Sequence, residues 1–375
     1  MRIKPLYKEI YAELERKILT GELTDGDKIS TEMEIVEKYS VSRITAKRVM
    51  EDLARDGYIE RKRRLGSFVK SNRKTIAPSS AQRMKTDDML HLALVSPFPP
   101  EGFDLFKNII QNADDNRIIP SMYITENSIE KEATVLENLL KYNLGGLIMA
   151  PIERRENSFL YHQFRKNGVP VVFIDRHLPW LDIPYVSTNN YKAMYDLTEW
   201  VIGQGYKDIA FLGNFEVVSV ENNRLRGFMQ ALMDNGLTQD SRWLHFLEAE
   251  PNNKINYLVW REERILEYFK ILQRMNALPE VIMCINDELA SVTMKVCAQL
   301  NFNVPGDISI TGFDNSSLYN TVNEMLTTVD QNYTALGNLA LNLLLDVKNG
   351  KAVPSEQLID IKIIIRDSVR RSSDL

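Results

Sequence analysis

The sequence predicts an α+β winged helix-turn-helix N-terminal domain over residues 1–72, joined to an α/β two-lobed domain over residues 90–375. Three amphipathic helices and a basic hairpin fit within the first part. Residues 73–89 are polar, contain Pro78 and show no apolar period, which is typical of a flexible linker. In the second part, short apolar strands alternate with amphipathic helices, which indicates parallel sheets covered on both faces. This part is long for a single sheet layer, so we expect two lobes.

The first two helices follow from apolar spacing and from a cap. Apolar residues recur every four positions from Leu6 to Ile18 and predict an amphipathic helix. Thr31, followed three residues later by Glu34, has the arrangement of a capping box. We therefore expect a short second helix that runs from Thr31 to Tyr39.

The third helix has the pattern of a DNA-recognition helix. Ser42 is its expected N-cap, and Gly57 is expected to end it. An apolar stripe between Ala46 and Leu53 faces the core, so the opposite face, which is basic near the N-terminal end, is free to enter a major groove. The candidate DNA contacts on this helix are Arg43, Ile44, Thr45, Lys47 and Arg48.

A basic hairpin follows the third helix. Tyr58–Lys62 and Ser67–Lys70 are expected to form two short strands around the turn Arg63-Arg64-Leu65-Gly66. Arg64 and Gly66 are candidates for a phosphate or minor-groove contact at the tip of this wing. The alternative is that the whole segment is a solvated basic helix on an ordinary domain.

Together, these elements resemble a known family of DNA-binding domains. The run PLYKEIYAELERKILTGELTDGDKISTEMEIVEKYSVSRITAKRVMEDLARDGYIERKRRLGSFV is similar to the N-terminal domain of GntR-type bacterial transcription regulators. The resemblance implies a winged helix-turn-helix that binds double-stranded operator DNA. Two positions depart from the family, which usually has Arg in place of Lys47 and in some branches an Arg in place of Met33. Lysine makes a single charged contact instead of a bidentate fork, so the departures concern the operator sequence that is recognised.

Charge is distributed unevenly along the chain. The net charge is −5 overall, but residues 1–74 hold 18 Lys and Arg against 13 Asp and Glu, a net of +5. The remainder holds 28 against 38, a net of −10. A basic N-terminal domain on an acidic body lets one part bind phosphates while the other stays off the DNA.

Composition also bounds cofactors and location. Cys284 and Cys297 lie in apolar segments and are expected to be buried thiols in a reducing compartment. The four histidines lack metal-ligand spacing, so no metal and no cofactor are expected. The N-terminus lacks the apolar core of a signal peptide, and no apolar run approaches a membrane span. We expect a cytoplasmic protein with no membrane partner, which excludes a free-standing transport receptor.

Polar and aromatic residues follow several of the predicted strands of the second domain. Ligands of parallel α/β sheets bind beyond the carboxyl ends of strands, and Asp, Asn, Arg and aromatic groups suit a polyhydroxylated ligand. No nucleophile elbow, phosphate-binding loop or metalloprotease motif is present, so we do not expect an enzyme. The residues after the strands are Ser96-Pro97-Phe98, Ala150-Pro151, Asp175-Arg176, Asn286-Asp287 and Phe313-Asp314-Asn315.

The second domain resembles another family. The segments VPVVFIDR, GYKDIAFLG, ENNRLRGFMQAL, VIMCINDELA, VPGDISITGFDN and LTTVDQNYTALGNLALNLLL are similar to the effector domain of LacI-type repressors. The resemblance runs from about His91 to Arg370 and implies a type I periplasmic-binding-protein-like fold of two lobes. It carries the family's sugar contacts to Asp175, Arg224, Asn286 and Asp314, with their neighbours Arg176 and Asp287 and the first-lobe residues Phe98 and Phe103 as further candidates.

Each of these candidates has an alternative role. Asp287 is equally expected as the cap of a helix over residues 288–300, and Phe98 and Phe103 as core residues. Asp314 could cap the next segment, and Arg224 could lie on a helix surface.

A GntR-like domain on a LacI-like sensor is similar to the arabinose-repressor branch of Gram-positive bacteria. The resemblance implies a homodimeric, sugar-responsive repressor of carbohydrate-utilisation genes that a monosaccharide, L-arabinose or another pentose, releases from its operator. One alternative is a regulator that activates or that needs its ligand as co-repressor. A less favoured alternative is a sugar-modifying enzyme fused to a DNA-binding domain.

Overall fold

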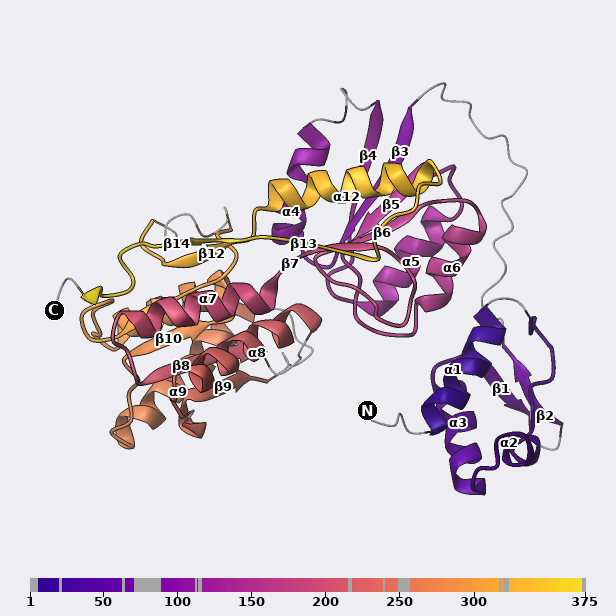
Figure 1. Ribbon diagram of the computed structural model, residues 1–375, viewed down its shortest axis with the longest axis horizontal. Coiled ribbons are helices and arrows are strands. Elements are labelled where there is room, and N and C mark those ends of the chain that lie inside the picture. The colour runs from indigo at the N-terminus through magenta and orange to yellow at the C-terminus, as the bar shows by residue number, and fades with distance from the viewer. Residues whose placement is uncertain are drawn as a thin grey trace.

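The structure is a computed structural model that describes residues 6–19, 22–62, 65–70, 89–111, 113, 117–214, 218–238, 240–248, 257–316, 319 and 324–372. Of the predicted linker 73–89, all residues but Met89 lie outside this described part. Figure 1 shows an N-terminal body, here called the head, beside two α/β bodies, lobe 1 and lobe 2.

The head has the three helices and the hairpin expected from the sequence. Its helices enclose a small core built around Ile10, Ile35, Val49 and Leu53. The two hairpin strands pair antiparallel, with Ile59 opposite Val69. Its elements are α1 (Leu6–Leu19), α2 (Glu32–Tyr39), α3 (Arg43–Arg55), β1 (Ile59–Lys62) and β2 (Gly66–Val69).

The predicted caps are confirmed. Thr31 Oγ1 accepts the Glu34 N–H at 3.2 Å, and the Glu34 carboxylate accepts the Thr31 N–H at 2.7 Å, which completes the capping box. Ser42 Oγ accepts the Thr45 N–H at 3.2 Å and caps α3. Gly57 follows the helix with a φ of +79°, a backbone conformation that favours glycine.

Lobe 1 is a six-stranded parallel sheet with helices on both faces. The strand order is β13-β7-β6-β5-β3-β4, and every pair is parallel. One core lies between the sheet and α4 with α12, and a second lies under α5 and α6. The elements are β3 (Leu90–Ser96), α4 (Pro99–Gln111), β4 (Ile118–Ile124), α5 (Ile129–Leu139), β5 (Gly146–Met149), α6 (Ser158–Lys166), β6 (Val171–Ile174), β7 (Tyr185–Thr188), α12 (Tyr333–Lys348) and β13 (Glu356–Ile359).

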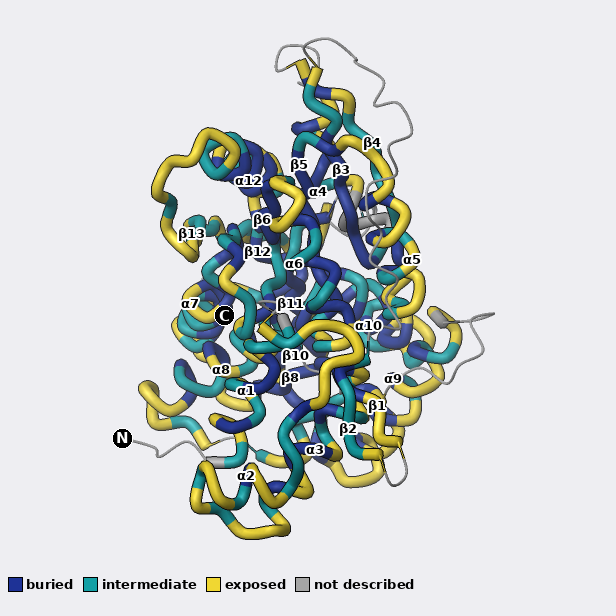
Figure 2. Tube along the Cα trace, turned by 90° about the vertical axis from the view of Figure 1, so that its right-hand side faces the viewer, coloured by how far each residue is buried: buried dark blue, intermediate teal, exposed yellow. Residues whose placement is uncertain are grey.

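Lobe 2 has a smaller parallel sheet in the order β11-β10-β8-β9, with a two-stranded antiparallel sheet of β12 and β14 beside it. A single large core runs through it, and Figure 2 shows buried chain at the centre of the molecule. Its elements are α7 (Asn190–Gly203), β8 (Ile209–Asn214), α8 (Ser219–Asp234), the 3-10 helix η1 (Ser241–Trp243), β9 (Leu244–Leu247), α9 (Tyr257–Arg274), β10 (Val281–Cys284), α10 (Asp287–Gln299), β11 (Ser309–Thr311), β12 (Thr328–Asp330) and β14 (Lys362–Ile364).

The chain passes between the lobes three times: after β7, after β12 and after β13. In the sequence, the apolar tail 358–366 predicts a single strand that ends one lobe, and the third passage shows that this prediction is wrong. Instead, β13 pairs with β7 in lobe 1, and β14 pairs with β12 in lobe 2. Asp360 and Ile361 lie between the two strands, at the crossing.

Among the helices of the described residues, none is both long enough and apolar enough to span a bilayer.

Candidate functional site

The N-terminal half of α3 presents an exposed face with two cations and an apolar side chain. Arg43, Lys47 and Ile44 are exposed, and Ile44 keeps 81 % of its surface open to solvent. Thr45 is half-buried, and its hydroxyl lies 2.9 Å from that of Ser42. An exposed isoleucine at the start of a basic helix contributes nothing to the core, so this face is available for contact with DNA bases.

Two of the candidate DNA-contacting residues, Arg48 and Lys47, also make contacts within the head. Arg48 lies over the ring of Tyr7, 4.4 Å from its centroid, and Lys47 Nζ lies 3.6 Å from Glu51. Both contacts are on the surface and contribute little free energy, so DNA phosphates can replace them. Arg64 lies outside the described residues. Gly66 begins β2 with a φ of +118° and pairs with Lys62, next to the turn at the tip of the wing.

Arg43→Ala is expected to weaken binding to the specific operator by about 1–3 kcal/mol, since Arg43 is placed to read a base edge. The measurement is fluorescence anisotropy at fixed salt, on an operator selected from random duplexes and on a duplex of scrambled sequence. Arg55→Ala, at the opposite end of α3, is the control and is expected to have little effect. An equal loss on both duplexes would make Arg43 a phosphate contact.

In the sensor, Asp175 and Arg176 follow β6 and lie with Phe98, which follows β3. The guanidinium of Arg176 is 5.7 Å from the Phe98 ring centroid and 3.9 Å from the Asp175 carboxylate. Asp175 has a φ of +65°, a left-handed backbone conformation that few residues other than glycine adopt. Its Oδ1 is buried and has no hydrogen-bond partner among the described residues. Burial raises the pKa of Asp175, while Arg176 and Arg224 act to lower it.

Arg224 on α8 contacts residues of several other elements of the sensor. Its side chain is only 5 % exposed and lies 3.8 Å from the Phe313 ring centroid. Nε donates to Asn190 Oδ1 and Nη1 donates to the Ile285 carbonyl, each at 2.8 Å. Nη2 lies 3.2 Å from Asp314 Oδ1. The alternative that Arg224 lies on a helix surface is therefore wrong.

Asp314 links lobe 2 to a crossing between the lobes. Gln331 Nε2 donates to Asp314 Oδ1 at 2.6 Å, and Thr188 Oγ1 donates to Gln331 Oε1 at 2.9 Å. Thr188 ends β7 in lobe 1, whereas Gln331 lies between β12 and α12. The pair Arg224–Asp314 is thus joined through Gln331 to the second of the three chain passages between the lobes. Sequence reasoning did not single out Gln331 or Asn190.

Asn286 and Asp287 have roles that the sequence did not separate. Asn286 is the cap of α10, because its Oδ1 accepts the Leu289 N–H at 2.9 Å. The expected alternative, Asp287 as this cap, is wrong. Asp287 is fully buried and accepts from Thr328 Oγ1 at 2.6 Å and from the Ser316 N–H at 3.1 Å, so it ties α10 to β12 and to the loop after β11.

Phe103 is not brought to this group. It lies on α4 with 62 % of its surface exposed, and no described contact joins it to Arg176 or Arg224. The possibility that Phe103 is a core residue does not agree with that exposure. Phe98, half-buried under Arg176, is the aromatic residue that the structure places at the carboxyl end of β3.

A second polar group, which the sequence analysis missed, lies on lobe 2 beside α8. Asn214 at the end of β8 donates to Glu221 Oε1 at 2.9 Å, and Arg261 donates to Asn214 Oδ1 at 3.2 Å. Glu221 Oε2 is buried without a partner among the described residues. Burial raises the pKa of Glu221, and Arg176 of lobe 1 is among the cations that oppose the rise. The available signal was Asn214, a polar residue that directly follows a predicted strand.

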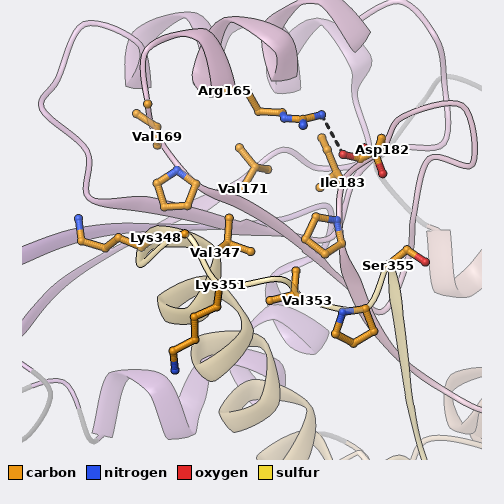
Figure 3. Close-up of a pocket in the computed structure, with 15 residues that line it drawn as sticks. Arg165, Val169, Val171, Asp182, Ile183, Val347, Lys348, Lys351, Val353 and Ser355 are labelled. Carbon is orange, nitrogen blue, oxygen red and sulfur yellow. Dashed lines mark hydrogen bonds between the residues drawn. The ribbon is translucent and has the colours of Figure 1, made fainter.

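A cavity of about 450 Å³ lies elsewhere in lobe 1 (Figure 3). It is lined by residues that precede β6, β7 and β13 and by the end of α12, with Arg165 Nη1 donating to the Asp182 carbonyl at its rim. These are the amino ends of the strands, whereas Asp175 and Arg176 follow the carboxyl end of β6. The cavity is therefore separate from the candidate effector site. Within the described ranges, no three His, Cys, Asp or Glu side chains are placed to hold a metal ion.

Comparison with known proteins agrees with both parts of this geometry. Residues 6–69 match bacterial regulatory proteins of the gntR family, and residues 198–369 match the periplasmic binding protein-like domain. The chain joins a GntR-family head to a periplasmic-binding-protein-like sensor. The chain therefore contains both of the domain types that its motifs predicted.

Two relatives align with this chain over nearly its whole length. An arabinose metabolism transcriptional repressor of Halalkalibacterium halodurans is 24 % identical over 376 residues and covers 96 % of each chain. One of Geobacillus stearothermophilus is 25 % identical over 381 residues and covers 98 % of each. The transcription regulator CcpA of Lactococcus lactis superposes with a TM-score of 0.64 and 20 % identity, over 75 % of this chain and 100 % of that one. The last comparison shows the fold alone.

Proposed function

We propose that this GntR-type regulator is a homodimeric, sugar-responsive transcriptional repressor, that its effector is an uncharged monosaccharide, and that this sugar is L-arabinose. The observation that carries the proposal is the group around Arg224. A buried guanidinium, the carboxylates of Asp175 and Asp314 and the aromatic ring of Phe98 follow the carboxyl ends of strands from both lobes. Such groups bind vicinal hydroxyls, and the relatives named as arabinose repressors favour a pentose.

The charges of the site favour a neutral sugar over a sugar phosphate. Three carboxylates, Asp175, Glu221 and Asp314, lie with the arginines Arg176, Arg224 and Arg261, of which Arg261 is paired with Glu288. Asp314 pairs with Arg224, and Asp175 lies beside Arg176. The arginines are therefore already compensated, and a phosphate would meet uncompensated negative charge.

A dimer is proposed because operators are usually two-fold symmetric and a dimer positions two heads on two half-sites. We assign no catalytic activity to the sensor. The second candidate, a fused sugar-modifying enzyme, predicts a changed sugar after incubation, whereas we expect the sugar to be recovered unaltered.

L-Arabinose is expected to raise the melting temperature of the full-length regulator and to weaken its binding to operator DNA. At a sugar concentration of 100 Kd, mass action stabilises the sugar-binding state by about 2.7 kcal/mol. D-Xylose, D-ribose and a pentose 5-phosphate serve as comparison ligands in the same thermal-shift titration. Operator binding is then titrated with and without the sugar that binds. Tighter operator binding with sugar would mean a co-repressor, and no thermal shift with any pentose would remove the proposed effector class.

A further inference from the structure

The head contacts lobe 1 through a buried carboxylate. Glu15 on α1 is 7 % exposed, and Arg155 Nη1 of lobe 1 lies 3.1 and 3.0 Å from its two oxygens. Within the head, Tyr58 donates its hydroxyl to Glu15 Oε1 at 2.9 Å. Among the described residues, Arg155 is the cation paired with Glu15. A carboxylate this deeply buried is costly without a charged partner. That partner, Arg155, comes from lobe 1 and not from the head itself.

Aromatic rings from both bodies surround the same guanidinium. The Arg155 guanidinium is 5.7 Å from the ring centroid of Tyr11 on α1 and 4.7 Å from that of Trp180 in lobe 1. Trp180 is itself held in place, because its Nε1 donates to Ser158 Oγ at 2.9 Å. An arginine that lies near two aromatic rings and donates from Nη1 to both oxygens of one carboxylate favours one orientation of the two bodies.

The loop that carries Arg155 is fixed at both ends by one buried residue. Glu132 on α5 is fully buried, and its carboxylate accepts the Ile152 N–H at 2.8 Å and Asn157 Nδ2 at 3.0 Å. Tyr161 donates its hydroxyl to the same carboxylate at 3.0 Å. Residues 152–157, here called the junction loop, are therefore anchored to α5 at their two ends, at the carboxyl end of β5, and Glu132 holds none of the residues between those ends.

The junction loop also contacts lobe 2. The carboxylate of Glu153 accepts the Ser219 N–H, with both oxygens at 2.9 Å, and the Ser219 hydroxyl at 2.8 Å. Ser219 begins α8, the helix that carries Arg224 and Glu221. A carboxylate at a helix N-terminus is electrostatically favoured, so this contact stabilises the arrangement in which lobe 1 touches the start of α8. Two residues of the same loop thus bind lobe 2 and the head.

We propose that Arg155 and Trp180 form a docking surface on lobe 1 for α1 of the head, and that lobe closure through Glu153 and Ser219 sets the strength of this docking. When the lobes close on a sugar, the junction loop is fixed, the head docks, and the spacing of the two heads in a dimer no longer fits the operator. When the lobes open, Glu153 loses its contact with Ser219 on α8, and the head undocks from lobe 1. The coupling to sugar rests on the proposed function, whereas the docking itself does not.

The docking is tested first without DNA or sugar, by the distance between spin labels on Glu37→Cys in the head and Glu137→Cys in lobe 1. Cys284 and Cys297 are buried, so the labels go to the introduced cysteines. The labelled full-length chain is diluted into unlabelled protein so that distances within one chain dominate. For the parent, a narrow docked population is expected beside a broad undocked one, whereas Arg155→Glu and Glu15→Arg should show the broad population alone. The double variant Arg155→Glu with Glu15→Arg should restore the narrow population, because it re-forms the ion pair with its charges exchanged.

Arg154→Glu is the matched control, since it makes the same charge change on the exposed neighbouring residue and should leave the distance unchanged. A narrow population in Arg155→Glu, or no recovery in the double variant, would overturn the docking surface even if the chain is a sugar-responsive repressor.

The coupling is tested by operator release under L-arabinose. Arg155→Glu is expected to need about tenfold more sugar for half-release, and the double variant should return to the parent value. In the parent, added sugar should enlarge the docked population at the expense of the undocked one, and in Glu153→Ala it should no longer do so. An unchanged sugar requirement in a variant that has lost docking would show that docking is not part of the response.

Discussion

Replacing Arg224 by alanine is expected to abolish release of the regulator from operator DNA by sugar while leaving operator binding intact. Arg224 holds Asn190, the Ile285 carbonyl and Asp314 at once, with almost no exposure to solvent. Removing one partner of a buried ion pair costs about 3–5 kcal/mol, because the remaining charge is left uncompensated. The head has its own core and does not depend on this contact. The variant should therefore behave as a permanent repressor in a reporter assay.

Two further variants separate the loss of sugar binding from a loss of folding. Arg226→Ala, on the exposed side of the same helix, is expected to keep both folding and release. Arg224→Lys keeps one charge near Asp314, but its single nitrogen cannot reach the three partners that Nε, Nη1 and Nη2 of Arg224 contact, so an intermediate response is expected. The sugar response is measured by operator titration, and folding by thermal denaturation. Release of Arg224→Ala at the parent sugar concentration would place the effector site elsewhere.

Gly227→Ala is expected to destabilise lobe 2 through a clash with backbone. A Cβ at residue 227 would lie 2.2 Å from the Tyr191 carbonyl oxygen and 3.0 Å from the Tyr195 nitrogen, so α7 and α8 would have to separate. Overpacking of this kind costs about 3 kcal/mol, and the better helix propensity of alanine returns about 1 kcal/mol. We therefore expect a net loss of about 2 kcal/mol in the free energy of unfolding.

Gly203→Ala is the control for Gly227→Ala, since a Cβ there has nothing within 4 Å and residue 203 is exposed at the end of α7. It should leave the stability unchanged or raise it by about 0.5 kcal/mol. Both variants are measured by denaturant titration of the full chain. Equal midpoints for the two would mean that α7 and α8 can separate without cost.

The spacing of Arg224 and Gly227 illustrates what the sequence could predict. Both residues lie in the segment ENNRLRGFMQAL, and the structure shows why each residue type is needed there. The guanidinium of Arg224 reaches Asp314, and the lack of a side chain at Gly227 lets α7 approach closely. Strands and helices with strong apolar patterns, and the caps at Thr31 and Ser42, were equally predictable because their signals are local.

Contacts between distant segments were not predictable in this way. Glu153 and Ser219 are 66 residues apart, and Glu15 and Arg155 are 140 apart. Nothing in the local pattern marks either pair, since each residue is of a type that is usually exposed. The edge strand β9 was missed for a related reason, since most of its residues are only partly buried.

The three passages of the chain between the lobes make the two halves of the sensor inseparable. Lobe 1 depends on α12 and β13, and lobe 2 on β14, all of which are encoded after Gln331. A premature stop codon soon after Gln331 would therefore remove elements from both lobes at once: α12 and β13 from lobe 1, and β14 from lobe 2. Most of each lobe would nevertheless have been translated. The head has no such dependence, because all of its elements come from one continuous stretch. A truncated chain of this kind would retain a DNA-binding module while losing the sensor that controls it.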